Sequence, residues 1–265
     1  MGYLSYFKMI IFSKLQYRAS EISGVITQFF FGIIYILIYE MFYENGNSIP
    51  LNWSDLTSYL WLVQSFYALV FFRISDKDIL KSISSGQIAY ELVRPQNIYF
   101  VWYTKLCANR FGAVLTRFFP IILIGTILPA KYALHAPCSF FALLIFLVVL
   151  ILGVFVSNAI AMLIYIFMFY TVSCKGLFNS ISCIIDFFSG VCIPIVMMPE
   201  TLQKIIKYLP FRLFADTPFR IYIGMITIYE GISTIFLQIL WIMVLILIGN
   251  ILMKKVSSKV CIQGG

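Results

Sequence analysis

The stretch FFALLIFLVVLILGVFVSNAIAMLIYIFMF, residues 140–169, decides the fold of this chain. It lies within forty-three consecutive residues, 132–174, that contain no Asp, Glu, Lys or Arg. About 20 apolar residues are enough to cross the hydrocarbon core of a bilayer. We therefore expect a transmembrane helix here, in a protein whose function is performed within or across a membrane.

The composition of the whole chain agrees with this expectation. Of its 265 residues, 62% are hydrophobic and 11% are charged, whereas a soluble domain has about 45–50% apolar and about 25% charged residues. A net charge of +8 and a pI near 9.1 could indicate a nucleic-acid partner. The basic residues flank apolar segments, however, which fits the anionic inner leaflet better. We expect one transmembrane domain, 1–265, and no nucleic-acid partner.

Six membrane spans can be drawn, so the expected fold class is all-α and polytopic. They cover residues 22–42, 56–72, 111–128 (with a start possible earlier, within 98–110), 140–169, 177–197 and 232–253. With a cytoplasmic N-terminus, fourteen of the nineteen basic residues fall in inner segments: Lys8, Lys14, Arg18, Arg73, Lys77, Lys81, Arg94, Lys105, Arg110, Arg117, Lys175, Lys254, Lys255 and Lys259. Inner segments carry the excess of Lys and Arg, which predicts that both termini are cytoplasmic.

Three segments between the spans have predicted structure of their own. Residues 1–20 mix aromatic and basic side chains, which suits a helix lying at the inner interface. In the inner loop 73–97, Ser75 and Asp78 predict a capping box, Gly86 a break between two short helices, and Pro95 a stop. In the outer stretch 199–224, three prolines predict short helices in or dipping into the outer interface.

Motifs for catalysis and metal binding are absent. The sequence has no G-x-x-x-x-G-K-[ST], no H-E-x-x-H and no G-x-S-x-G, and its single histidine, His135, falls in a short outer loop. The six cysteines, Cys107, Cys138, Cys174, Cys183, Cys192 and Cys261, have no C-x-x-C spacing and are expected to pack as small apolar side chains. We expect no enzyme activity and no metal in this chain.

Two features inside the spans each leave two interpretations open. Asp186 is an acid well inside a predicted span, and such a costly group faces a bundle interior or a wet cavity. It belongs either to a translocation path or to a structural hydrogen bond between helices. Gly153, Ser157 and Ala161 recur every four residues, which lets helices approach closely. That stripe serves either packing within the chain or a subunit or substrate contact.

The inner loop carries charges of both signs, which argues against a simple lipid-binding patch. They are Asp76, Lys77, Asp78, Lys81, Glu91 and Arg94. A capped, mixed-charge helix held against the membrane suits a docking site for a cytosolic protein, and the alternative is an ordinary solvated loop.

Three stretches resemble the permease subunits of type-2 ABC exporters, in the branch of small six-span permeases with a separate ATPase subunit. These are SGQIAYELVRP at 85–95 and FFSGVCIPIVMMPETLQKIIKYLPF at 187–211, followed by TPFRIYIG at 217–224. The pattern Gly-x-Ile-x-x-x-Leu-x-Arg-Pro resembles the coupling segment of that family. The order of an interfacial helix, six spans and outer short helices before the last span extends the resemblance over the whole chain.

The resemblance implies that residues 76–95, including Gly86 and Pro95, contact ABC ATPase subunits that bind ATP and Mg²⁺. It implies a second permease, identical or related, with a cavity between the first, second and fifth spans of the two copies. Gln28, Gln64 and Asp186 are then candidate lining residues, chosen because they are polar within a span. This chain would hold no cofactor itself and would reside in the plasma membrane of a bacterial cell.

The expected function is therefore that of the membrane half of an ATP-driven exporter. Closure of the partner ATPases would move the inner loop, and the permease pair would release an amphiphilic or lipophilic substrate outward by alternating access. The alternative is an ion-coupled secondary transporter that acts alone. That alternative would need coupling-ion sites in internal repeats, and the sequence has one buried acid and no convincing repeat.

Overall fold

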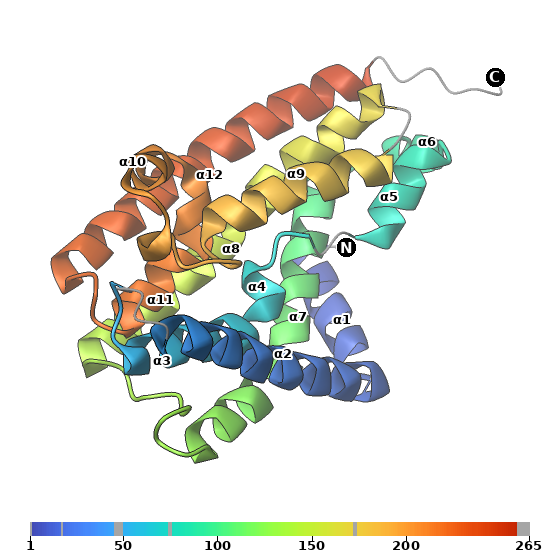
Figure 1. Ribbon diagram of the computed structural model, residues 1–265. Helices are drawn as coiled ribbons and strands as arrows, with labels where there is room; N and C mark the ends of the chain where they lie inside the picture. The colour runs from blue at the N-terminus through green and yellow to red at the C-terminus, as the bar shows by residue number, and fades with distance from the viewer. Residues whose placement is uncertain (1, 17, 45–49, 74–75, 172–173, 259–265) are drawn as a thin grey trace.

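A computed structural model describes residues 2–16, 18–44, 50–73, 76–171 and 174–258, and all regular structure in these ranges is helical (Figure 1). The longest helices are α2 (Arg18–Glu44), α7 (Ile98–Ile127), α8 (Phe140–Phe167) and α12 (Ile228–Ser257). The shorter ones are α1 (Tyr3–Gln16), α3 (Trp53–Ser65), α4 (Tyr67–Val70), α5 (Lys77–Ser84), α6 (Ile88–Leu92), α9 (Cys174–Ser189), α10 (Glu200–Tyr208) and α11 (Asp216–Tyr222), with 3-10 turns η1 (Met168–Tyr170), η2 (Ile195–Met197) and η3 (Pro210–Phe214). The all-α expectation is confirmed.

Four of the described helices are long and apolar enough to cross a membrane. They are Glu21–Glu44, Ile98–Ile127, Phe140–Tyr170 and Ile228–Ser257. They contain the first, fourth and sixth predicted spans and all of the third except Leu128. Helix α7, which contains the third predicted span, begins at Ile98, the earlier of the starts that the sequence allowed. Asn97 explains this start, because its side chain accepts a hydrogen bond from the Tyr99 amide at 3.0 Å and caps the helix.

The second and fifth predicted spans are wrong as continuous helices. Residues 56–72 are divided at Phe66 into α3 and α4, and the chain leaves helical geometry at Phe71. The fifth helix, α9, ends at Ser189 and not at Met197. Gly190 has a φ of +87°, a left-handed conformation that ends helices, and Pro194 lacks an amide donor. At 1.5 Å per residue, α9 is about 24 Å long.

The core is built around α8, which packs against α12 and against the short helices α11 and η3. A Cβ added at Gly153 would lie 2.7 Å from the Phe214 Cα, so only glycine lets η3 pack this closely on α8. The fully buried Gln238 of α12 donates to the Val149 and Leu213 carbonyl oxygens, both at 2.8 Å. These contacts tie the outer segment to two long helices.

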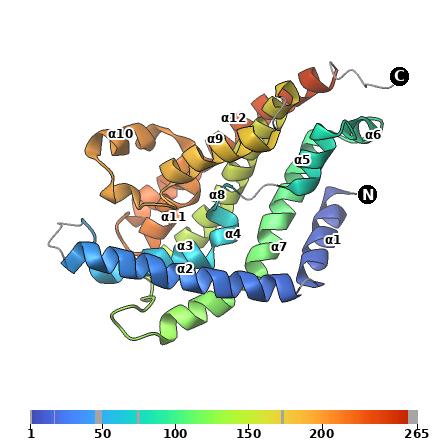
Figure 2. The ribbon, with the colours of Figure 1, turned by 45° about the vertical axis from the view of Figure 1, so that its right-hand side comes forward.

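The stretch 199–224, which the sequence predicts to lie outside, forms short helices, α10, η3 and α11, and not one continuous span. Pro210 opens η3, and Pro218 lies in the first turn of α11, where a helix needs no amide donor from the chain. The stretch ends at Gly224, which has a φ of +82°. In Figure 2, α10 and α11 lie at one end of the molecule, and α5, α6 and the C-terminal end of α12 lie at the other.

The N-terminal helix α1 lies along α7 (Figure 2). Two edge-to-face aromatic pairs join them, Tyr3 with Phe100 at 6.3 Å between ring centroids and Phe7 with Phe111 at 6.2 Å. Leu4 and Phe12 on the other side of α1 are 67% and 64% exposed. One apolar face is therefore packed and the other is free for a membrane surface.

Candidate functional site

The segment from Asp76 to Pro95, which the sequence predicts to be the coupling segment and which keeps that name below, consists of α5, a turn at Gly86 and α6. Gly86 has a φ of +74°, which favours glycine, and α6 ends at Leu92, three residues before Pro95. The capping box predicted for Ser75 and Asp78 includes Ser75, whose structure is not described. Asp76 caps α5, because its Oδ1 accepts hydrogen bonds from the Asp78 and Ile79 amides, both at 3.0 Å. Ser75, Lys259 and Cys261 lie outside the described residues.

Asp76 is also the centre of a buried polar network, and it is only 9% exposed. Its carboxylate accepts from Lys105 Nζ at 2.9 Å and from Asn109 Nδ2 at 2.7 Å, both on α7. The Asp76 amide donates to the Tyr165 hydroxyl of α8 at 2.9 Å. The start of the coupling segment is therefore fixed to two long helices at once.

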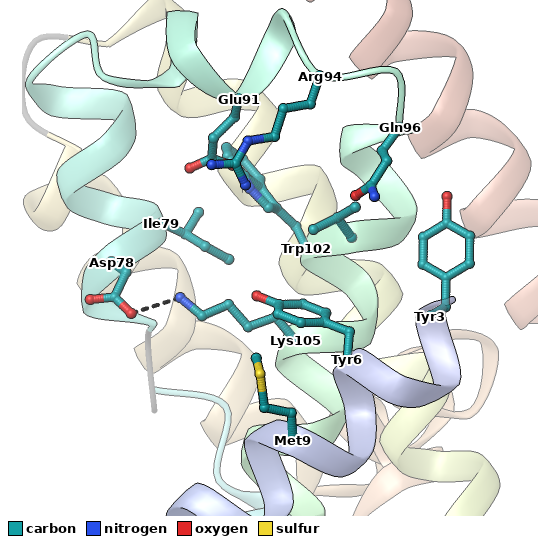
Figure 3. A pocket seen from close by; sticks show the side chains of 11 residues that line it. Tyr3, Tyr6, Met9, Asp78, Ile79, Glu91, Arg94, Gln96, Trp102 and Lys105 are labelled. Carbon is teal, nitrogen blue, oxygen red and sulfur yellow. Dashed lines mark hydrogen bonds and ion pairs between the residues drawn. The ribbon is translucent and has the colours of Figure 1, made fainter. Parts of the chain in front are cut away.

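Asp78 shares the Lys105 ammonium with Asp76, but at the surface. The Asp78 Oδ2 lies 2.7 Å from Lys105 Nζ, and the Asp78 side chain is 83% exposed (Figure 3). The hydrogen bond from Lys105 holds the pKa of Asp78 below its usual range. A depressed carboxyl pKa stabilises the fold above the unfolded pKa, near 3.9, and this contribution is lost as the pH falls through the folded value. At this exposure the contribution is small.

Glu91 joins α6 to its surroundings. Its carboxylate accepts from Trp102 Nε1 of α7 at 2.7 Å and from Ser82 Oγ of α5 at 3.0 Å. Glu91 thus faces inward, and Figure 3 shows Arg94 beside it. These residues line a 480 Å³ cavity closed by α1, the coupling segment and α7. Charged side chains on both sides of the Gly86 turn form hydrogen bonds and ion pairs, and these hold α5 and α6 in place relative to each other.

The outward side of the coupling segment combines charged and apolar groups. Lys77 and Lys81 are exposed and one helical turn apart. Tyr90 is 79% exposed and Val93 is 82% exposed. These two apolar side chains were not among the residues predicted from sequence. The outward side of this segment therefore presents two lysines and two exposed apolar side chains.

Asp186 binds the connection that leads into the coupling segment. Its carboxylate accepts from the backbone amides of Phe72, at 2.6 Å, and Arg73, at 3.3 Å, and the residue is 1% exposed. The buried Arg110 donates to the Leu69 carbonyl oxygen at 2.6 Å and interacts electrostatically with Asp186. Hydrogen bonds from α7, α9 and α8 therefore hold Leu69, Phe72 with Arg73, and Asp76, respectively.

A second cavity, of 610 Å³, lies among α2, α3, α4 and the turn after α9. Gln28 and Gln64 both line it, and Asp186 does not. The Gln28 Oε1 is buried and has no hydrogen-bond partner among the described residues. Arg73 and Arg117 line the same cavity, so the structure adds two cations to the two amides that the sequence singled out.

The stripe of Gly153, Ser157 and Ala161 lies on the buried side of α8. Ser157 and Ala161 are 0% and 3% exposed, and Gly153 lies against η3 as described above. All three residues are therefore buried within this chain. No group of three metal-binding side chains occurs among the described residues, and Cys107, Cys138, Cys183 and Cys192 are free thiols.

A family model for ABC-2 family transporter proteins matches residues 25–264. The chain belongs to the ABC-2 transporter family. The match covers all the long helices except the start of α2, and it includes the coupling segment. It also covers the residues that line both cavities, apart from those in α1 and in the first turns of α2. No curated protein matches the sequence. Family membership and the apolar helices make this a membrane protein, of a family whose members are normally non-catalytic subunits associated with an ABC ATPase.

The buried partners of the coupling segment in this ABC-2 transporter were missed from the sequence. Lys105, Arg110 and Arg117 were assigned to inner segments, and the structure places all three within α7. Arg117 pairs with the buried Glu21 of α2 at 2.6 Å. A charged residue in an apolar helix is costly unless it is paired. Three cations in the apolar pattern of 98–127 were therefore the signal for buried partners.

Proposed function

We propose that this ABC-2 transporter is the membrane subunit of an ATP-driven exporter that moves an amphiphilic or lipophilic substrate outward by alternating access. The proposal rests on one observation about the coupling segment. Asp76 and Glu91 fix the side of this segment that faces the long helices, and the opposite side is exposed to solvent. A partner ABC ATPase, which would bind ATP and Mg²⁺, docks on Lys77, Lys81, Tyr90 and Val93. A secondary transporter acting alone is not favoured by the family match.

The proposed mechanism passes the ATPase motion through rigid contacts. Movement of α5 shifts Asp76, which is bonded to Lys105 and Asn109 of α7 and, through its amide, to Tyr165 of α8. The same connection is held at its other end by Asp186 of α9. Because these bonds are short and mostly buried, the segment transmits displacement to three helices and does not absorb it by bending.

We place the substrate pathway at the cavity of Gln28 and Gln64, completed by a second copy of this chain or a related permease. The cavity combines aromatic walls, Phe31, Tyr35 and Tyr67, with polar amides, which suits an amphiphile. Gln64→Leu should leave the protein folded and change the dependence of partner ATP hydrolysis on added amphiphile. An unchanged dependence in both Gln64→Leu and Gln28→Leu would remove this cavity from the pathway.

We further propose six spans with both termini in the cytoplasm, in which α3–α4 and the shorter α9 serve as the second and fifth. Without the three cations inside α7, eleven basic residues remain in inner segments, against the five outer ones Lys131, Lys204, Lys207, Arg212 and Arg220. In intact cells, and with the six native cysteines replaced by serine, a membrane-impermeant maleimide should label Tyr229→Cys and spare Ser258→Cys. Labelling of position 258 from outside would overturn the orientation.

The docking role is tested by purifying the chain from its native membrane together with its partner ATPase. Arg94→Ala is expected to preserve insertion and lower the stimulation of ATP hydrolysis, since truncating a charge that an interface buries and pairs typically costs about 2–5 kcal/mol. Glu91→Ala should act in the same direction by releasing Trp102 and Ser82. Glu91→Gln is the matched control, because its amide oxygen still accepts from Trp102.

The result that contradicts the proposal is specific. If Arg94→Ala and Glu91→Ala both assemble with the ATPase and stimulate it like the unmodified chain, residues 76–95 are not the coupling element. If no P-loop ATPase co-purifies and the chain transports by itself, the exporter proposal fails as a whole.

A further inference from the structure

A third hollow, of 460 Å³, lies at the opposite end of the molecule from the coupling segment. It is formed by α10, η3, α11 and the start of α12. Four basic side chains line it: Lys204, Lys207, Arg212 and Arg220. These are four of the five basic residues of the proposed outer segments. The fifth, Lys131, is paired with Glu40 elsewhere. Outer segments are ordinarily poor in Lys and Arg, so this concentration in one hollow requires an explanation.

The acids that line the hollow do not neutralise it. Asp216 is fully buried, and its carboxylate accepts from the Ile195 amide at 3.2 Å and from Arg220 at 3.5 Å. Glu230 is engaged in the capping box of α12, where it accepts from the Thr227 amide at 3.0 Å. Four cations against two anions leave two net positive charges. Lys204, Lys207 and Arg212 form no ion pair within the described residues.

The two guanidinium groups also retain unused donors. The Nε atoms of Arg212 and Arg220 are buried and have no hydrogen-bond acceptor among the described residues. A buried donor without an acceptor destabilises the fold, and an arginine fork matches the oxygens of a phosphate group. Lys204 and Lys207, three residues apart on α10, stand exposed at the same hollow. The donors therefore suit an oxyanion with several acceptor oxygens.

We infer that this hollow binds a phosphate oxyanion, held by the Arg212 and Arg220 guanidinium groups below and by Lys204 and Lys207 at the rim. The group belongs either to an anionic lipid headgroup of the adjacent leaflet or to a soluble phosphorylated compound. The site is separate from the cavity of Gln28 and Gln64, because the two share no lining residue. The inference does not depend on which substrate is transported.

The test uses the full-length chain in nanodiscs and compares two sources of phosphate. In one arm, inorganic pyrophosphate is titrated into protein in phosphatidylcholine nanodiscs, and binding is measured calorimetrically. In the other, phosphatidylglycerol retained by the protein in mixed phosphatidylglycerol and phosphatidylcholine nanodiscs is quantified by native mass spectrometry. Binding in the first arm identifies a soluble ligand, and selective retention in the second identifies a lipid headgroup.

The double variant Lys204→Gln with Lys207→Gln is expected to weaken the observed binding about tenfold or more, since it removes two charged donors. Both lysines are exposed, so the variant should melt like the unmodified chain. The matched control is Lys254→Gln with Lys255→Gln, which removes the same charge from exposed positions at the other end of α12. Binding in neither arm, or equal loss in the variant and the control, would overturn the inference.

Discussion

Replacement of Asp76 by alanine is expected to lower the free energy of unfolding by about 3–5 kcal/mol and to abolish stimulation of the partner ATPase. Asp76 is buried, and its loss would leave the Asn109 amide and the two first-turn amides of α5 without their acceptor. It would also leave the mostly buried Lys105 with only the exposed Asp78 as a counter-charge. Breaking a buried ion pair on one side carries a penalty of this size.

Asp78→Ala is the matched control, because Asp78 bonds to the same Lys105 ammonium from an exposed position. A surface ion pair contributes about 0–1 kcal/mol, so this variant should melt close to the unmodified chain. Asp76→Asn should fall between the two, since it keeps an oxygen for the cap and loses the charge. Thermal melting in detergent and ATPase stimulation are measured for all three variants. Equal melting of Asp76→Ala and Asp78→Ala would show that burial of Asp76 contributes nothing.

The helices of this protein were easier to predict from sequence than their polar contacts. The charge-free run at 132–174 predicted α8 because apolar length is a local property of the chain. The end of α9, just before Gly190, was not predicted. Gly190 and Pro194 are both visible in the sequence, but apolar residues continue beyond them, so the predicted span was too long. Hydropathy alone does not detect a left-handed residue inside an apolar run.

The position of the candidate site was predictable from the sequence, but its hydrogen bonds and ion pairs were not. Gly86 and Pro95 mark the coupling segment by local turn chemistry. The partners of Asp76, by contrast, lie 29 to 89 residues further along the chain, at Lys105, Asn109 and Tyr165. Such pairings depend on how helices cross, which a single sequence does not encode locally. The exposed Tyr90 and Val93 were missed for the same reason, since the packed face of a five-residue helix is set by its neighbours.

Asp186→Leu is the second variant for which we expect a large effect, a loss of about 3–5 kcal/mol in the free energy of unfolding. The carboxylate is the acceptor for the Phe72 and Arg73 amides, and leucine offers none. A buried amide without an acceptor costs about 1–3 kcal/mol. The variant also removes a negative charge that interacts with the buried Arg110, and an uncompensated buried cation adds to the cost.

Asp186→Asn separates the hydrogen bond from the charge. Asparagine is nearly isosteric, and its amide oxygen can still accept from the Phe72 amide, so we expect this variant to fold and to melt between Asp186→Leu and the unmodified chain. The measurements are thermal melting in detergent and stimulation of the partner ATPase. If Asp186→Leu melts and stimulates like the unmodified chain, the contact between α9 and residues 72–73 has no role in stability or in coupling. If Asp186→Asn folds normally but stimulates the ATPase poorly, the charge itself serves the transmission of motion, because the hydrogen bond to Phe72 would still be present.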